Sequence, residues 1–309
     1  MDETFNRDSF SDHLFAYRSV ESKRLILSLI ITSTVMIVEI IGGLVANSIA
    51  LISDAGHMFT HCFAIGISLL AIYIARNPPC HHKTFGLYRA EVLAAFINGV
   101  FLLLVVVIII YEAILRILNP QEILSFYMLI VAIIGLTVNI SSILILQGSR
   151  KSDLNIRSVV SHMFADAISS IGIVIVAITI FYTGWTILDP LVSIAISAII
   201  LYWAFGILKE STRILLEMAP KGLNVDTISK DLKYNFKEIL ELYNVHFWTI
   251  TPKMLIFSAH MLLSEEIDKN SNQDSLLTEI NNYLKDKYRI TESTIQITSS
   301  INVMKCNIE

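Results

Sequence analysis

Five side chains that can bind a metal ion lie within two strongly apolar stretches of this sequence. Asp54, His57 and His61 belong to the first stretch, and His162 and Asp166 belong to the second. A spacing of four residues places His57 with His61, and His162 with Asp166, on one face of a helix, and Asp54 falls on about the same face as His57. If the two helices face each other, three imidazoles and one carboxylate form a four-ligand site of the kind that zinc prefers.

The alternative is that each of these side chains bonds its helix neighbours and only fixes the packing. A charged side chain at the centre of a bilayer costs roughly 2.5–3.5 kcal/mol or more, so its presence needs a reason. Two such pairs in separate apolar stretches favour the metal site. Calcium and magnesium require six or more oxygen ligands, which these residues do not supply.

The composition indicates that both stretches cross a membrane. Of the 309 residues, 54% are hydrophobic and 16% are charged, against about 25% charged in soluble domains, and the mean hydropathy is +0.63. This excludes a wholly soluble enzyme and a secreted disulfide scaffold, and a net charge of −4 gives no support for nucleic-acid binding. Six runs are long enough to span the lipid bilayer as helices, at 25–46, 49–75, 90–111, 124–146, 158–182 and 190–208.

The basic residues near the ends of these runs predict the orientation. They gather before the first run, between runs two and three, between runs four and five, and after the sixth, whereas the opposite side carries only Arg116. Cytoplasmic loops carry the excess of Lys and Arg. We therefore expect a multi-pass protein with both termini in the cytoplasm. With no organelle signal and no cleaved leader in residues 1–24, the cell membrane is the expected location.

Residues 209–309 contain no apolar run long enough to span a membrane. Their sequence pattern predicts a small α/β cytoplasmic domain. The apolar spacing favours helices at Thr227–Leu240 and Leu276–Tyr288. Alternating and β-branched residues favour strands at Val245–Thr251, Leu255–Leu263 and Ser293–Thr298. The expected architecture is thus residues 1–24 as a cytoplasmic segment, 25–208 as a six-helix membrane domain and 209–309 as the α/β domain.

Other polar residues give weaker signals. Glu39, in the first run, either lines a wet path or bonds between helices, and a relay role for it is a hypothesis, whereas Asn98 and Asn139 favour interhelical bonding. Arg89 and Glu217 are expected to form an ion pair between the third run and the segment after the sixth.

Several segments resemble the cation diffusion facilitator family, and in particular its zinc-type members. NSIALISDAGHMFTH and SVVSHMFADAISS are similar to the paired motifs of that family, and TFGLYRAEVLAAFINGV, STRILLEMAP, VHFWTIT and FSAHMLL are similar to other segments of it. The resemblance covers about residues 20 to 300. It implies a homodimer with six spanning helices per protomer and a ferredoxin-like cytoplasmic domain, which exports a divalent transition metal in exchange for protons.

The resemblance also implies roles for particular residues. His57, His162 and Asp166 match ligands of the transport site, and His61 stands at the fourth ligand position, where zinc-type members usually have Asp. With a neutral imidazole there, a bound Zn²⁺ and one carboxylate leave a net charge of +1, which is costly in a low dielectric. Asp54 is the candidate that offsets this charge, as a second-shell group or an alternate ligand. A nitrogen-rich site favours zinc, with cadmium, cobalt or nickel as further substrates, over manganese.

In the cytoplasmic domain, members that bind metal use several histidines. Here Tyr243 and Ser293 stand where other members often have His, so His260 is only a weak candidate ligand. His81 and His82, next to Cys80 on a loop, are another weak signal. No cofactor is expected, and the metal is the transported substrate.

Two alternatives remain. A membrane metalloenzyme would need a general base beside its zinc ligands, but Met58 and Met163 follow His57 and His162, so we do not expect an enzyme. A transport-silent partner subunit, disabled by His61, is the more serious alternative.

Overall fold

The computed structural model describes residues 30–75, 81–147, 154–252, 254–264 and 273–298, and the side chains at 142–147, 154–163 and 165 lie outside that description. The described residues fall into two compact units. The first takes its residues from Met1–Leu69 and Ile97–Gly206, and the second takes its residues from Leu70–Phe96 and Ile207–Glu309.

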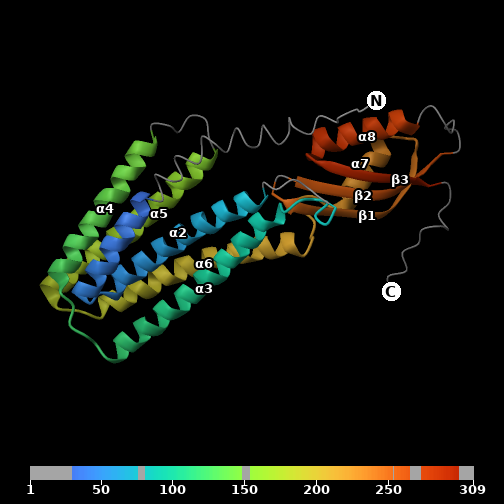
Figure 1. Ribbon diagram of the computed structural model, residues 1–309. Coiled ribbons are helices and arrows are strands. Elements are labelled where there is room, and N and C mark those ends of the chain that lie inside the picture. Colours follow the sequence, from blue (N-terminus) through green and yellow to red (C-terminus); the bar gives the residue numbers. More distant parts are fainter. Residues whose placement is uncertain (1–29, 76–80, 148–153, 253, 265–272, 299–309) are drawn as a thin grey trace. The chain divides into compact units, whose positions relative to one another are not determined.

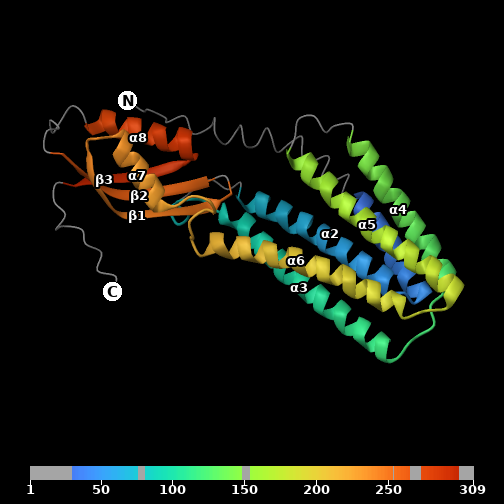
Figure 2. The same cartoon turned by 180° about the vertical axis from the view of Figure 1, so that it is seen from behind.

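Between residues 30 and 215, the described residues form mainly long apolar helices (Figures 1 and 2). Four helical stretches are long and apolar enough to cross a membrane, and two further apolar helices, Ile30–Ala46 and Ser125–Ser141, are shorter within the described residues. The chain is therefore a multi-pass membrane protein, as the composition predicted. The full helices are α2 (Ile49–Ala75), α3 (Arg89–Leu118), α4 (Ser125–Gln147), α5 (Leu154–Thr183) and α6 (Leu188–Leu215).

Small residues let the helix Ile30–Ala46 approach α4 closely. A Cβ at Gly42 would overlap the side chain of Val131, and a Cβ at Gly135 would lie 2.5 Å from Oε1 of Glu39. Within lipid, such close approach is a main source of helix association, because apolar burial gives little gain there.

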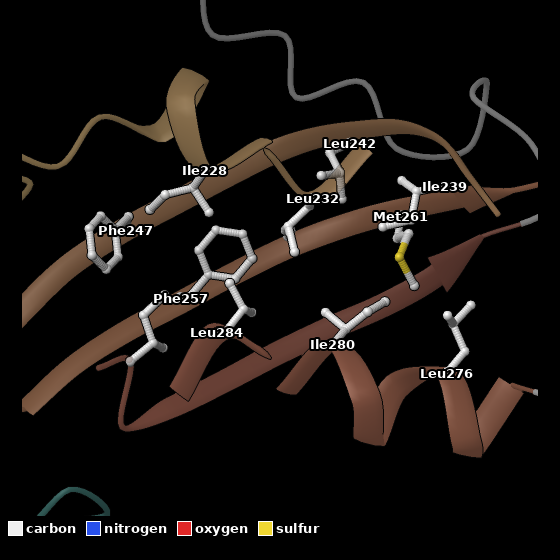
Figure 3. Packing of buried hydrophobic residues seen from close by; sticks show 12 residues of the cluster. Ile228, Leu232, Ile239, Leu242, Phe247, Phe257, Met261, Leu276, Ile280 and Leu284 are labelled. Carbon is white, nitrogen blue, oxygen red and sulfur yellow. The ribbon is translucent and has the colours of Figure 1, made fainter. Parts of the chain in front are cut away.

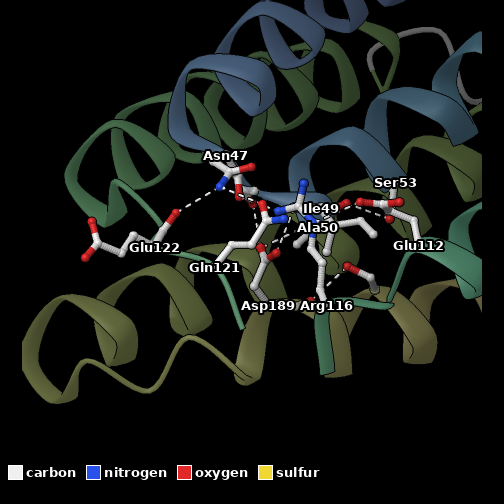
Figure 4. A network of polar contacts seen from close by, with 11 residues as sticks. Asn47, Ile49, Ala50, Ser53, Glu112, Arg116, Gln121, Glu122 and Asp189 are labelled. Atoms are coloured by element: carbon white, nitrogen blue, oxygen red, sulfur yellow. Dashed lines mark hydrogen bonds and ion pairs between the residues drawn. The ribbon is translucent and has the colours of Figure 1, made fainter. Parts of the chain in front are cut away.

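A carboxylate from α6 caps the beginning of α2 (Figure 4). Asp189 accepts hydrogen bonds from the Ser48 hydroxyl at 2.5 Å and from the backbone N–H groups of Ile49 and Ala50 at 2.7 and 3.2 Å. The first N–H groups of a helix have no partner within the helix, so an acceptor here stabilises it. Asp189 is fully buried, and it links the starts of α2 and α6.

The turn before α2 is held by side chains as well (Figure 4). Asn47 has φ +54°, a left-handed conformation that asparagine tolerates better than most residues. Its amide donates to Oε1 of Gln121 at 3.1 Å and to the carbonyl of Glu122 at 3.0 Å. Arg116 Nη1 donates to the Asn47 carbonyl at 2.6 Å. The turn is thereby tied to the end of α3 and to the loop before α4.

The second unit contains a three-stranded sheet in the order β1-β2-β3. β1 and β2 pair antiparallel, and β2 and β3 pair parallel. The succession helix–strand–strand–helix–strand agrees with the prediction from the sequence. The elements are α7 (Val225–Asn235), β1 (Ile239–Thr251), β2 (Met254–Leu263), α8 (Gln273–Tyr288) and β3 (Glu292–Thr298).

The prediction of a helix up to Leu240 was wrong at its end. The helix ends at Asn235, Phe236 is extended as the C-cap, and β1 begins at Ile239. The apolar spacing continued past the end of the helix because Phe236 and Ile239 still contribute to the same core from outside the helix.

The core of this unit lies between the sheet and its two helices. Ile228 and Leu232 of α7, and the apolar face of α8, pack against strand residues (Figure 3). Phe257 and Met261 on β2 are fully buried in this cluster. Burial of one such side chain contributes about 1.5–3 kcal/mol.

Asp231 joins α7 to α8 at the surface of this core. Its carboxylate accepts hydrogen bonds from Lys287 Nζ at 2.8 Å, from the Tyr288 hydroxyl at 2.6 Å and from the Tyr283 hydroxyl at 2.8 Å. The Lys287 ammonium and the Tyr288 hydroxyl lower the pKa of Asp231 to about 2. Because the folded pKa is below the ordinary value, the stabilisation is complete above about pH 4. It is lost as the pH falls towards 2.

We expect Asp231→Ala to destabilise the packing of α7 on α8 by roughly 1–2 kcal/mol, because three donors lose one acceptor. Amide hydrogen exchange on the full chain at pH 7 should show faster exchange in both helices. Asp286→Ala, an exposed site on α8, is the matched control. Unchanged exchange in Asp231→Ala would contradict the assignment.

The predicted pair of Arg89 and Glu217 is present. Arg89 Nη2 donates to Glu217 Oε1 at 2.5 Å, and both residues belong to the second unit. Both side chains are exposed, so the pair contributes about 0–1 kcal/mol.

Candidate metal centre

Helix α2 presents the first group of candidate ligands. Its apolar sequence keeps the helix continuous from Ile49 to Ala75, so the three- and four-residue spacings hold in three dimensions. Asp54 and His57 are buried and His61 is partly buried. The Nε2 atoms of His57 and His61 lie 3.0 Å apart, and the two rings meet edge to face at 4.3 Å between centroids.

Asp166 on α5 completes a group of three. Its Oδ1 lies 3.6 Å from Nε2 of His57, and one ligand atom from each of His57, His61 and Asp166 lies within 4.8 Å of the others. In a tetrahedral site with bonds of about 2.0–2.1 Å, neighbouring ligand atoms are about 3.3–3.4 Å apart. The three side chains therefore need to move only slightly to hold one zinc ion.

Two further observations fit a cation at this position. Oδ1 of Asp166 is buried and has no hydrogen-bond partner among the residues that the structure describes. A buried carboxylate oxygen without a donor is costly, and a bound cation removes that cost. Across the whole described part of the chain, this is the single group of three or more potential ligands.

The fourth predicted ligand, His162, lies in α5 one turn before Asp166, but its side chain is outside the described residues. Its place in the ligand set stays a prediction.

Asp54 has a different position from the three clustered residues. Its carboxylate accepts from the Ser169 hydroxyl at 2.8 Å and from the Ser170 hydroxyl at 3.4 Å. Both serines are on α5, so Asp54 links α2 to the helix that carries Asp166. Asn139 of α4 donates to Ser170 at 3.3 Å, which is the interhelical bond expected for it.

The two serines and Trp203 were not predicted from the sequence. Ser169 and Ser170 follow Asp166 by three and four residues, which is a helical spacing that could have indicated them. Trp203 of α6 has its ring centroid 6.2 Å from that of His57, and nothing in the sequence indicated this contact.

The weaker candidates lie in the second unit. His260 lies beside Tyr243, whose ring centroid is 5.8 Å away, and its Nδ1 is 3.4 Å from the Asn244 amide. His81 and His82 are exposed in a turn. Cys80 and Cys306 are outside the described residues.

Comparison with known proteins identifies the family. The family model of the cation efflux transmembrane domain matches residues 25–216. The chain belongs to the cation efflux family. This confirms the resemblance drawn from the motifs around His57 and His162, and it places the chain among membrane transporters rather than enzymes.

Relatives in the cation efflux family match over most of their length. The zinc transporter ZitB of Pectobacterium atrosepticum is 39% identical over 280 residues, covering 90% of this chain and 86% of the relative. ZitB of Escherichia coli is 36% identical over 277 residues, covering 89% and 87%. The cadmium, cobalt and zinc/H(+)-K(+) antiporter of Bacillus subtilis is 37% identical over 277 residues, covering 89% and 88%.

Proposed function

We propose that the protein exports zinc from the cytoplasm in exchange for protons, with cadmium, cobalt or nickel as further substrates. The observation that carries this proposal is the convergence of His57, His61 and Asp166 between two membrane helices. The names of the zinc-transporting and antiporting relatives support the same substrate class.

His57, His61, His162 and Asp166 are the proposed ligands of the transported ion. Imidazole and carboxylate together suit zinc, and the nitrogen-rich set disfavours manganese, magnesium and calcium. Asp54 is proposed to offset the net charge of the loaded site from its position on the α5 serines, where it lies close without joining the cluster. His260 stays a weak candidate in the cytoplasmic domain.

Proton coupling follows from competition for the same lone pairs. The Nε2 atoms of His57 and His61, 3.0 Å apart, can approach this closely when one of them carries a proton and the other accepts it. A metal ion must displace that proton, because a ligand has to be deprotonated to bind. Protons that enter from outside compete with the metal for these nitrogen atoms and favour its release.

The proposed assembly is a homodimer in the cell membrane. Each protomer would have a cytoplasmic segment at 1–24, six spanning helices within 25–208, and a ferredoxin-like cytoplasmic domain at 209–309. The cytoplasmic position of both termini is supported by the clusters of basic residues at the span ends.

Transport into inverted membrane vesicles tests the function. We expect an acidic vesicle interior to accelerate zinc uptake, and ammonium chloride, which dissipates the gradient, to slow it. Zinc uptake that ignores the imposed pH gradient would contradict proton antiport. A potassium gradient imposed at constant pH is the second arm, because one relative is named as an H(+)-K(+) antiporter.

His61→Asp distinguishes an active transporter from a transport-silent subunit. We expect the variant to export zinc within about threefold of the wild-type rate, because both side chains supply one zinc ligand. Zinc efflux from metal-loaded cells is the measurement, and His82→Asp, at an exposed turn, is the control. A large gain over a wild-type rate near zero would favour the silent subunit.

A further inference from the structure

Glu39 is a buried carboxylate that the proposed metal site does not use. It lies in the helix Ile30–Ala46 and is 1% exposed. Its Oε2 is buried and has no hydrogen-bond partner among the residues that the structure describes. An ionised carboxylate in such surroundings is costly, so it either carries a proton or is balanced by a cation.

The neighbouring helix α4 leaves room for this carboxylate. Oε1 of Glu39 lies 2.5 Å from the position that a Cβ at residue 135 would take, and Gly135 has none. Asn139, one turn further along α4, donates to Ser170, which in turn donates to Asp54. The α4 surface next to Glu39 thus continues into the polar contacts beside the metal site.

The charge on Glu39 depends on that site. Within the part of the chain that the structure describes, the charged groups that act on it are Asp54 of α2 and Asp166 of α5, and Asn139 on the nearby face of α4 is neutral. Like charges repel, so the charge that Glu39 can carry depends on whether a metal ion neutralises these two carboxylates. A divalent cation at His57, His61 and Asp166 cancels the two negative charges of Asp54 and Asp166, and the repulsion that they exert on an ionised Glu39 is then removed.

We propose that Glu39 carries one of the protons that are exchanged for the metal, without being a metal ligand. Its carboxylate takes a proton from the outer solution as the metal leaves, and it gives that proton to the cytoplasm as the next metal binds. One O–H bond forms and breaks in each cycle. The proposal rests on the proposed proton antiport.

Glu39→Gln tests this role, because the amide keeps the size of the side chain and cannot exchange a proton. The purified full-length protein is reconstituted in proteoliposomes with a trapped pH indicator, and proton and zinc fluxes are measured together. We expect Glu39→Gln to move one proton fewer per zinc ion than the wild type. Its zinc dissociation constant should stay within about twofold of the wild-type value. Should net transport be too slow to measure, zinc–zinc exchange should persist. Glu122→Gln, an exposed carboxylate before α4, is the matched control.

Glu39→Asp should recover the wild-type ratio of protons to zinc, since it restores an exchangeable proton. An unchanged ratio in Glu39→Gln would overturn the proposal, as would a loss of zinc affinity or of zinc–zinc exchange, which would indicate a ligand or a packing role. If the rate of zinc transport by the wild type does not change with the pH gradient, the proposal of proton antiport is itself wrong. A wild type that responds to pH, with Glu39→Gln indistinguishable from it, refutes Glu39 alone.

Discussion

Asp166→Asn should weaken zinc binding to the purified protein by at least about 100-fold. Loss of a residue that only hydrogen-bonds a metal ligand costs about 10- to 100-fold in affinity, and loss of a ligand itself should cost at least as much. Asp166 is the anionic member of the described cluster, and its Oδ1 faces His57 at 3.6 Å. The amide keeps the shape and removes the charge. A divalent cation held by imidazoles alone would then keep its full charge in a low dielectric, which is costly.

Competition with a zinc-sensitive dye measures this loss, and Asp54→Asn is the matched carboxylate-to-amide change. Because Asp54 accepts from two serines on α5 and lies outside the cluster, we expect a smaller loss, on the order of tenfold. His57→Ala should match or exceed the Asp166 variant. Equal zinc affinity in Asp166→Asn and the wild type would remove Asp166 from the site.

Asp189→Ala should be the most destabilising of these substitutions, by roughly 2–4 kcal/mol. The carboxylate accepts three hydrogen bonds, two of them from backbone N–H groups at the start of α2. Removal leaves three buried donors without an acceptor, and each costs about 1–3 kcal/mol before relaxation. The loss of a helix cap alone costs about 1 kcal/mol.

Thermal unfolding in detergent, compared among variants, measures this effect. Asp189→Asn keeps an acceptor oxygen and should lose about half as much stability, and Ser48→Ala, which removes one donor, should lose about 1 kcal/mol. If Asp189→Ala unfolds at the wild-type temperature, the cap does not contribute to stability.

The residues that repeat along one helix were the ones that the sequence could predict. His57 with His61 share a face because of local helix geometry, and the length and apolarity of the spans follow from the bilayer. That Asp166 faces His57 was inferred from the cost of burying charge in lipid. The distance of 3.6 Å between Asp166 Oδ1 and His57 Nε2 agrees with this inference. The end of α7 was misjudged because apolar spacing continues across the turn at Phe236.

Contacts between helices could not be predicted in the same way. Asp189 lies in the first turn of α6, where an acidic residue is ordinary for that helix itself, yet its carboxylate bonds to α2. Trp203 is one aromatic residue in an apolar helix, and only the placement of α6 brings it near His57. Such roles depend on which helices are neighbours, and neither the periodicity of apolar residues nor the composition of the sequence predicts which helices are neighbours.

The cap on α2 fixes the start of the helix that carries His57 and His61. His57 follows the anchored residue Ile49 by eight residues, which is about 12 Å along the helix axis. If α2 tilted by about 10° around Ile49, the His57 imidazole would move sideways by about 2 Å, roughly the length of one zinc–nitrogen bond. If these residues hold the transported ion as proposed, a small tilt of α2 would be enough to open the site, with neither unwinding nor sliding of the helix.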